Sequence, residues 1–342
     1  MRVLVPEESR EVFEEASPPG LAPVFYSYRD LSLAQRLKRK LRLSSPTEEF
    51  GERFRPSSAD LDDIVATWLG AAVQLPARHA ECLLSQLPSL RWAYVQRTGM
   101  EHVALECFVN RAIPVSNSGS LTSRWVAEMI VTGIASHLKQ LPKHIHLQKR
   151  AQWSSLWTRG FNEVRVGIIG GSGNIGTETA RICRALGMHV TGTSRKWDFV
   201  RGQHPLFHRV LHTSEQLPEL LGSVDFVVLL VPLTPETRGF FGPDQLRLMK
   251  PGSALFNYGR VGLVDEPAVI AALTSRRLSA FYTDFLADHS LRSRLRAART
   301  PGLVLTHNSS AHARGKVRAA YEQFMRGLAL LHEPAAIPNR VC

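Results

Sequence analysis

A glycine-rich turn between an apolar strand and an amphipathic helix constrains the fold of this chain most strongly. The segment VRVGIIGGSGNIGTETARICRALG spans residues 164–187, and its glycines fit the spacing G-x-G-x-x-G. Glycine permits a tight turn, lets the backbone approach a pyrophosphate and lets the helix, expected over 175–186, pack closely on the strand. The N-terminus of a helix also favours phosphate through its free N–H groups and dipole. We predict dinucleotide contacts from six residues, with a purely structural glycine turn as the alternative: Gly171, Ser172, Gly173, Asn174, Ile175 and Gly176.

The end of the next strand bears on which dinucleotide binds. NAD-binding turns carry an Asp or Glu about 20 residues further on, which bonds the ribose 2′-hydroxyl. Counting from Gly173, this chain has Ser194, Arg195 and Lys196 there, and no carboxylate before Asp198. A hydroxyl with two cations suits a 2′-phosphate, so the sequence favours NADP(H) over NAD(H). In the alternative, the two cations are solvated loop charges.

Strand patterns alternate with helix patterns on both sides of this turn. The first series of strand candidates covers 2–7, 23–28, 64–70, 90–99 and 113–118. The second covers 164–171, 187–194, 224–232, 252–259, 278–285 and 302–308. Long helices are expected over 120–140 and 311–331, and residues 29–63 form a polar, Pro/Ser-punctuated insertion. This alternation predicts an α/β protein with parallel sheets covered by helices on both faces.

Length and composition exclude several classes of protein. The chain has 342 residues, which suits two domains because one core rarely grows beyond about 250–300 residues. No apolar run approaches the roughly 18–20 residues that span a bilayer, and the early acidic residues do not suit a signal peptide. The four cysteines include no C-x-x-C pair, which favours a reducing compartment over a structural zinc site. We expect a cytoplasmic protein with no membrane partner and no metal.

The formal net charge of +12 raises the question of an anionic partner. Residues 36–42 hold five bases and no acid, with leucines at helical spacing nearby, and 292–299 holds four arginines. No zinc-finger spacing or RNP-like aromatic motif accompanies them, so we do not expect nucleic-acid binding. The first run reads as a solvated helix, with a subunit contact or an anionic ligand as alternatives. The second run suggests a substrate with extra negative charge.

Further motifs follow the glycine turn in a specific order. They read LLVPLTPETRGFFG at 229–242, MKPGSALFNYGRVGLVDEPAVIAAL at 249–273 and TDFL at 283–286. With these motifs the chain resembles the D-isomer-specific 2-hydroxyacid dehydrogenase family along nearly its whole length. The resemblance implies a homodimer and a Rossmann doubly wound parallel sheet, 120–310, inserted in a discontinuous flavodoxin-like α/β substrate domain, 1–119 plus 311–342. It also implies further cofactor contacts: Val231, Pro232, Thr237, Tyr258, Gly259 and Asp284.

The active site of that family combines an arginine, a histidine and a glutamate. The arginine grips the substrate carboxylate, while the histidine, its pKa raised by the glutamate, donates a proton as hydride arrives. Residues 257–262 match the family pattern N-x-x-R-x-G, so the resemblance assigns the arginine to Arg260, with a structural ion pair as the alternative. The loop at 96–102 is about two residues shorter than the substrate loop of the family. The resemblance implies that the backbone of Gly99 and Met100 contacts the substrate.

Two catalytic positions depart from the family pattern. The glutamate position holds His289, and Asp288 could substitute only if the loop shifts by one residue. The histidine position holds Asn308, whereas His307 takes the place of a proline. An asparagine can donate a hydrogen bond but cannot deliver a proton, and His307 reaches the site only if the strand end bends.

Three functions stay open. The favoured one is an NAD(P)H-dependent oxidoreductase with a non-standard active site, acting on a small carboxylate-bearing substrate other than a 2-ketoacid; a specialised biosynthetic pathway would be a natural setting for it. The candidate reactions for such an enzyme are reduction of an activated C=C or C=N bond, or a hydride transfer whose proton comes from another group or from water. The second is an ordinary 2-ketoacid reductase or D-2-hydroxyacid dehydrogenase that uses a displaced histidine. The third is a non-catalytic NAD(P)-binding scaffold or sensor.

Overall fold

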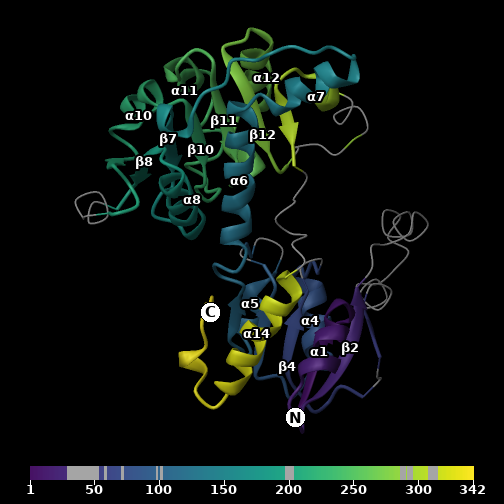
Figure 1. Ribbon diagram of the computed structural model, residues 1–342. Helices are drawn as coiled ribbons and strands as arrows, with labels where there is room; N and C mark the ends of the chain where they lie inside the picture. The colour runs from purple at the N-terminus through teal and green to yellow at the C-terminus, as the bar shows by residue number, and fades with distance from the viewer. Residues whose placement is uncertain are drawn as a thin grey trace. The chain divides into compact units, whose positions relative to one another are not determined.

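The computed structural model describes most of the chain in two compact units. The described residues are 1–28, 54–57, 60–70, 73–97, 99–100, 103–196, 204–285, 290, 296–306 and 315–342. The first unit comprises Met1–Leu121 with Arg314–Cys342, and the second comprises Thr122–Ala313 (Figure 1). Each unit is built on its own sheet, and the two sheets confirm the predicted parallel α/β fold class.

The sheet of the first unit has the strand order β3-β2-β1-β4-β5-β6. Its strands are β1 (Arg2–Pro6), β2 (Ala22–Tyr28), β3 (Phe54–Pro56), β4 (Ile64–Leu69), β5 (Trp92–Val95) and β6 (Val115–Asn117). Its helices are η1 (Glu7–Ser9), α1 (Arg10–Ala16), α4 (Ala77–Gln86), α5 (Leu105–Val109), α14 (Lys316–Ala329) and η5 (Pro334–Ala336). Apart from β3, the strands pair in parallel, in the order of flavodoxin-like sheets.

Alternating side chains divide the core of the first unit between the two faces of the sheet. Leu4 of β1 packs with the apolar residues of α4 and α5, while Val3 and Val5 pack with those of α1 and α14. On the second face, the Trp92 and Phe324 rings stack with centroids 5.2 Å apart. A period of two along a strand therefore serves two helical layers.

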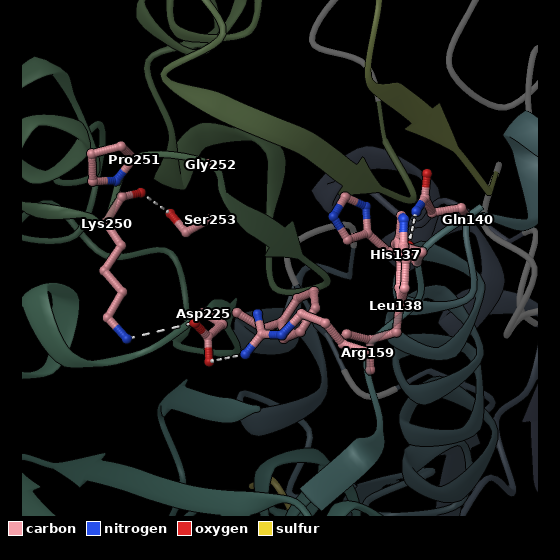
Figure 2. Close-up of a pocket in the computed structure, with 11 residues that line it drawn as sticks. His137, Leu138, Gln140, Arg159, Asp225, Lys250, Pro251, Gly252 and Ser253 are labelled. Carbon is pink, nitrogen blue, oxygen red and sulfur yellow. Dashed lines mark hydrogen bonds and ion pairs between the residues drawn. The ribbon is translucent and has the colours of Figure 1, made fainter. Parts of the chain in front are cut away.

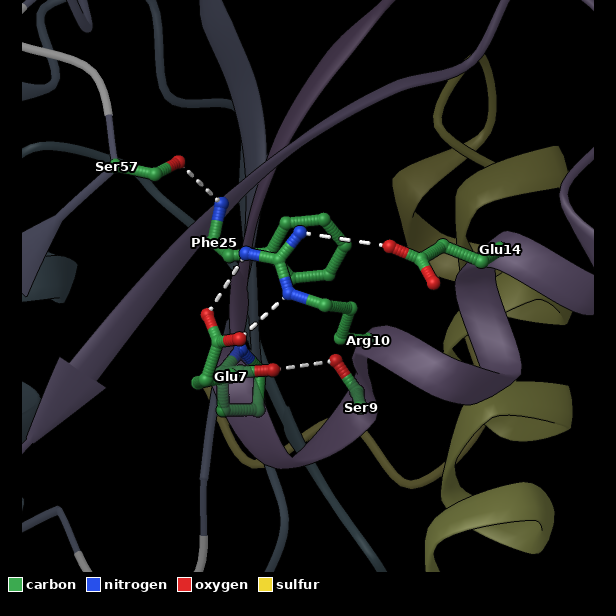
Figure 3. Close-up of polar contacts among 7 residues, drawn as sticks. Glu7, Ser9, Arg10, Glu14, Phe25 and Ser57 are labelled. Atoms are coloured by element: carbon green, nitrogen blue, oxygen red, sulfur yellow. Dashed lines mark hydrogen bonds and ion pairs between the residues drawn. The ribbon is translucent and has the colours of Figure 1, made fainter.

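Charged side chains fix the start of the first helix against β2 (Figure 3). The Arg10 guanidinium lies 4.0 Å from the centroid of the Phe25 ring and donates to Glu7 at 2.5 and 3.0 Å. This hydrogen bond is the main cause that lowers the pKa of the Glu7 carboxyl. The Phe25 N–H donates to Ser57 Oγ at 3.1 Å, which joins the strand to the segment after β3.

The sheet of the second unit has seven parallel strands in the order β13-β12-β11-β10-β7-β8-β9. They are β7 (Arg165–Ile169), β8 (His189–Ser194), β9 (Arg209–His212), β10 (Phe226–Leu229), β11 (Ser253–Asn257), β12 (Leu278–Thr283) and β13 (Leu303–Leu305). The helices are α6 (Ser123–Leu138), α7 (Leu141–Lys149), η2 (Phe161–Glu163), α8 (Asn174–Ala185), α10 (Leu217–Ser223), α11 (Pro243–Leu248), η3 (Val261–Leu263) and α12 (Glu266–Thr274). The strand order reverses between β7 and β10, and open α/β sheets bind ligands at the carboxyl ends beside such a reversal.

Two helical layers cover this sheet as well. α6 and α8 pack on one face, while α10, α11 and α12 pack on the other. Gly133 of α6 lies over the Phe256 and Tyr282 rings, which stack with centroids 4.4 Å apart. A Cβ at Gly133 would lie 2.8 Å from the Phe256 ring, so the glycine permits the close approach of α6.

Three elements differ from the sequence predictions. β3 pairs antiparallel with β2 at the edge of the sheet, within the segment predicted to be an insertion; an edge strand needs only one partner and leaves little pattern. β9 was not predicted because only Val210 and Leu211 of its four residues are apolar. α7 follows the helix expected over 120–140 and was not predicted; it buries no side chain, so the sequence shows no apolar periodicity there. No helix in the described ranges has the length and apolar character to cross a bilayer.

Candidate functional site

Strand register in the second unit places several predicted site residues side by side. Ile169, Leu229, Asn257, Thr283 and Leu305 are aligned partners across β7, β10, β11, β12 and β13. The residues that follow these partners therefore lie level along the carboxyl edge, and they include Gly170, Tyr258, Asp284 and Thr306.

The glycine turn after β7 has two kinds of glycine. Gly170 has φ +93°, and a Cβ there would lie 3.1 Å from the carbonyl group of Leu230. A Cβ at Gly176 would lie 2.5 Å from the Gly170 carbonyl oxygen. A Cβ at Gly173, an exposed residue, would come no closer than 3.4 Å to any atom outside its neighbours. The packing of the turn requires the first two, whereas Gly173 leaves open space outside the turn.

The N-terminus of α8 faces this open space. Gly173 is the N-cap residue, has extended backbone and has no side chain to accept from the first N–H groups of the helix. The first backbone N–H groups of a helix have no acceptor within the helix, so they are available to donate hydrogen bonds to a pyrophosphate. The open space and these donors show that the turn fits a dinucleotide.

The end of β8 carries the residues predicted to select the cofactor. Ser194 is 3% exposed, its Oγ donates to Ser172 Oγ at 3.2 Å, and it accepts from the Lys196 N–H at 3.1 Å. Arg195 and Lys196 are both exposed. The His212 ring Nε2 lies 3.2 Å from the Arg195 carbonyl oxygen, so β9 supports this backbone. The structure brings a hydroxyl pair and two cations next to the glycine turn.

The loop after β10 lies beside the same turn. Thr237 Oγ1 donates to the Pro232 carbonyl oxygen and accepts from the Thr234 N–H, both at 2.7 Å. A Cβ at Gly259 would lie 3.0 Å from the Val231 carbonyl oxygen, so the segments after β10 and β11 touch through their backbones. The predicted cofactor residues Val231, Pro232, Thr237 and Gly259 therefore belong to one packed edge.

A side-chain amide shapes the turn that carries Arg260. Asn257 is 1% exposed, its Nδ2 donates to the Arg260 carbonyl oxygen at 3.0 Å, and its Oδ1 accepts from the Gly259 N–H at 3.3 Å. Arg260 is half-buried with extended backbone, and its Nη1 donates to the Gly259 carbonyl oxygen at 3.0 Å. The N-x-x-R spacing thus has a structural cause, because the asparagine closes the turn that positions the arginine.

Three polar side chains are linked at the ends of β11, β12 and β13. Tyr258 Oη and Thr306 Oγ1 are 3.0 Å apart, and the Thr306 hydroxyl donates to Asp284 Oδ1. Burial raises the pKa of the Tyr258 hydroxyl, the hydrogen bond with Thr306 lowers it, and the charge of Asp284 raises it. The sequence did not single out Thr306 or Asn257 as site residues, although Asn257 begins the motif 257–262 and Thr306 lies in the strand candidate 302–308.

The other predicted site residues fall elsewhere. Gly99 and Met100 lie in the first unit after β5, where the Met100 side chain packs against the core and its carbonyl oxygen accepts from the Val103 N–H at 3.0 Å. Four predicted catalytic residues lie outside the described residues: Asp288, His289, His307 and Asn308. The basic run 36–42 and residues 292–295 also lie outside them, whereas Arg296 and Arg299 are described and exposed.

A separate pocket of about 310 Å³ lies at the amino ends of β10 and β11 (Figure 2). Asp225 lies there between Arg159 and Lys250, 3.5 Å from each. The His137 ring lies 3.2 Å from Ser279 Oγ, and burial lowers its pKa. Since the glycine turn occupies the carboxyl edge, this pocket is not part of the dinucleotide site.

The fold and the glycine turn define a dinucleotide-binding protein of the doubly wound class. The family described as D-isomer specific 2-hydroxyacid dehydrogenase, NAD binding domain, matches residues 131–309. This match covers more than half of the chain, and the chain belongs to the D-isomer specific 2-hydroxyacid dehydrogenase family. The resemblance inferred from the sequence motifs is confirmed.

Individual relatives support this assignment. The chain is 32% identical over 188 residues to D-3-phosphoglycerate dehydrogenase of Escherichia coli (strain K12), which covers 54% of this chain and 44% of that protein. The match thus spans less than half of that relative. The structure of D-2-hydroxyisocaproate dehydrogenase superposes with a TM-score of 0.79 at 16% identity, covering 100% of this chain and 99% of that chain. The structure of an NADPH-dependent glyoxylate/hydroxypyruvate reductase from Sinorhizobium meliloti, solved with NADP and sulfate, superposes with a TM-score of 0.73 at 22% identity. The superposition covers 99% of this chain and 98% of that chain. At these identities the solved structures show a shared fold.

Proposed function

We propose that the chain is an NAD(P)H-dependent oxidoreductase of the D-2-hydroxyacid dehydrogenase type with a non-standard active site. Hydride would move to or from a small carboxylate-bearing substrate. The observation that carries this proposal is the position of Arg260 on the same sheet edge as the glycine turn, held by the buried amide of Asn257. A dinucleotide site alone would not need that arginine.

The cofactor that we propose is NADP(H) in preference to NAD(H). Ser172 and Ser194 lie within hydrogen-bond distance, and Arg195 and Lys196 are exposed next to them. Because Ser194 donates its proton to Ser172, the Ser172 hydroxyl is the donor that this set offers to a 2′-phosphate, together with two positive charges. No described carboxylate occupies the position that would bind a ribose 2′-hydroxyl. Hydrogen bonds between ionised groups are stronger than those between neutral groups, so these residues would raise the affinity for NADP(H) as well as the selectivity against NAD(H).

Arg260 would orient the substrate. The bound nicotinamide supplies or accepts the hydride. The guanidinium of Arg260 stays charged at any physiological pH and can hold a carboxylate through two parallel hydrogen bonds. Because Asn257 fixes the backbone at both ends of the turn, Arg260 would hold the carboxylate in one orientation and so present the neighbouring carbon to the ring.

The proton would come from a group other than the histidine of the family pattern. That position holds Asn308, and the position of its paired glutamate holds His289. Asn308 can stabilise a carbonyl oxygen through a hydrogen bond but cannot deliver a proton, so the proton would come from His307, His289, Asp288, another group or water. This departure favours a substrate with different proton demands, such as an activated C=C or C=N bond in a specialised biosynthetic pathway.

Replacing Arg260 with alanine tests the proposal. We expect turnover to fall about a hundredfold or more, as positioning losses do, while NADPH binding measured by fluorescence stays unchanged. Arg247→Ala, which removes an exposed arginine of the same unit, is the matched control.

His307→Ala and Asn308→Ala, made separately, identify the residue that serves the reaction. Turnover of ordinary 2-ketoacids with loss only in His307→Ala would favour the second function. A protein that binds NADPH but never oxidises it, and whose partner binding survives Arg260→Ala, would favour a scaffold.

We also propose that the first unit binds the substrate and that the chain forms a homodimer. The backbone of Gly99 and Met100 would contribute to the substrate contact. Trp153 and Trp157 are fully exposed on the second unit, and burial at a subunit interface would remove both indole rings from water. Sedimentation of the wild-type chain and of Trp153→Ala with Trp157→Ala tests the dimer; two equal monomeric masses would contradict it.

A further inference from the structure

The pocket at the amino ends of β10 and β11 has more positive than negative charge on its walls (Figure 2). Among the described residues that line it, the charged side chains are Arg159, Lys250 and Asp225. The Asp225 carboxylate lies 3.5 Å from each cation, accepts from the Arg165 N–H at 2.8 Å and is 19% exposed. Asp225 therefore holds two cations at the pocket and balances the charge of one. A guanidinium and an ammonium have more N–H donors than these contacts use.

His137, at the end of α6, brings a hydrogen-bond acceptor to the same pocket. Ser279 Oγ lies 3.1 Å from the Ser253 carbonyl oxygen, which only accepts, so the single proton of the Ser279 hydroxyl points there. The 3.2 Å contact between Ser279 Oγ and His137 Nε2 then requires the histidine to donate. Burial lowers the pKa of His137 and so favours its neutral ring. A neutral ring with its proton on Nε2 has an unprotonated Nδ1, which can accept from a ligand.

Apolar groups form another part of the pocket wall. The His137 ring lies edge-on to the Phe226 and Tyr282 rings, with centroids 5.7 and 6.3 Å away, so packing helps to fix its orientation. Leu138, Phe226 and Pro251 line the pocket as well. Its volume of about 310 Å³ lies at the lower end of the roughly 300–1,000 Å³ that is typical of small-molecule pockets. The pocket therefore suits a small ligand with an apolar body.

Charge and hydrogen bonding together select the class of ligand. The excess of positive charge favours an anion, and a carboxylate accepts strong hydrogen bonds from arginine and lysine. The Nδ1 atom of His137 requires a donor on the same molecule. An ammonium donor would leave the ligand with no net charge and add a cation beside Arg159 and Lys250, which repel it. An uncharged donor such as a hydroxyl group avoids this repulsion.

We propose that this pocket binds a small organic monocarboxylate that also carries a hydroxyl group. The carboxylate would bind Arg159 and Lys250, the hydroxyl would donate to His137 Nδ1, and the apolar body would pack on Phe226. β11 runs from Ser253 at the pocket to Asn257, so the site lies at the opposite end of the strand from the turn that carries Arg260. Binding there needs no dinucleotide, and the inference is independent of the proposed function.

Titration calorimetry on the full chain, without added dinucleotide, tests the inference with three probes of one carbon skeleton. 3-Phenyllactate has a carboxylate and a hydroxyl, 3-phenylpropionate lacks the hydroxyl, and phenylalanine has an ammonium in its place. Lys250→Met removes a cation, Lys250→Arg keeps the charge, and His137→Phe keeps an aromatic ring without Nδ1. Arg247→Met is the matched control, because Arg247 is an exposed cation near Lys250 that pairs with Asp244. Arg260→Ala removes the arginine of the proposed substrate site.

We expect 3-phenyllactate to bind the wild-type chain and Arg260→Ala alike, and about three- to tenfold more tightly than 3-phenylpropionate, as for one hydrogen bond. Phenylalanine should bind more weakly than 3-phenyllactate. Lys250→Met should weaken 3-phenyllactate about tenfold or more, whereas Lys250→Arg and Arg247→Met should change its affinity less than about threefold. In His137→Phe, 3-phenyllactate and 3-phenylpropionate should bind equally, a change that a general loss of structure would not produce.

Three results would overturn the inference. One is the absence of saturable 3-phenyllactate binding by the wild-type chain. Another is binding that is lost in Arg260→Ala but kept in Lys250→Met, which would place the probe at the proposed substrate site. The third is an unchanged preference for 3-phenyllactate over 3-phenylpropionate in His137→Phe, which would mean that the hydroxyl does not meet His137. A wild-type chain that binds 3-phenyllactate in this pocket but never binds or oxidises NADPH would refute the proposed function and leave this inference intact.

Discussion

Gly173→Ala and Gly176→Ala should separate cofactor binding from folding within a single turn. A Cβ introduced at Gly176 would lie 2.5 Å from the Gly170 carbonyl oxygen and 2.9 Å from the Gly171 Cα, both backbone atoms. A Cβ introduced at Gly173 would meet only one atom, at 3.4 Å, an ordinary contact. The substitution at Gly176 strains the protein itself, whereas the substitution at Gly173 fills only the space in front of the helix N-terminus.

The structure sets the size of each effect. Relief of the Gly176→Ala overlap needs a backbone shift of roughly 0.9 Å to reach ordinary contact, and overpacking of this kind costs about 1–3 kcal/mol. For a unit of roughly 190 residues that free energy corresponds to a fall in Tm of about 2–12 °C. Gly173→Ala loses a good N-cap but restricts the unfolded chain, and these terms offset to within about 1 kcal/mol.

Circular dichroism melts and NADPH titration by fluorescence measure the two effects separately. We expect Gly173→Ala to melt within a few degrees of the wild type and to bind NADPH at least about tenfold more weakly, because its methyl group meets the pyrophosphate. Gly176→Ala should lose both stability and affinity. Wild-type affinity in Gly173→Ala would refute the assignment of the open space to the pyrophosphate. Equal destabilisation of both variants would refute the packing argument.

Three further predictions concern other parts of the molecule. Arg195→Ala with Lys196→Ala should weaken NADPH about tenfold or more and leave NADH nearly unchanged, as measured by fluorescence titration; equal losses would contradict a 2′-phosphate site. The His189 and His208 rings stack 3.9 Å apart, and burial, first among the causes, lowers the pKa of both below 6.5. Below about pH 6.5 the unfolded chain therefore binds protons more readily than the folded chain. Urea melts should show that the free energy of unfolding decreases as the pH is lowered, and that it decreases less steeply in His208→Gln. Gly327→Ala would place a Cβ in overlap with the Trp92 indole ring beneath α14, and it should lower the free energy of unfolding by about 1–3 kcal/mol in the same melts.

Much of the second unit could be predicted from the sequence because its signals are local. The apolar runs predicted β7, β8, β10, β11 and β12 within a few residues of their observed bounds. The helix expected over 175–186 is α8, Asn174–Ala185, because the glycine turn and an apolar face define both of its ends. β9 has polar residues at both ends and α7 buries no side chain, so neither carries a comparable apolar pattern and the sequence did not predict them.

The sequence by itself determined the residue types at the site: glycines for a tight turn, a hydroxyl and two cations after the next strand, and an arginine in an asparagine-led motif. Tertiary structure alone decided how these residues combine. Tyr258 and Thr306 are 48 positions apart, and Thr306 and Asp284 are 22 apart. They meet because the parallel register aligns Asn257 with Thr283 and Thr283 with Leu305, so the next residue of each strand lies level. Register depends on which side chains pack across the whole sheet, and no short stretch of sequence contains that information.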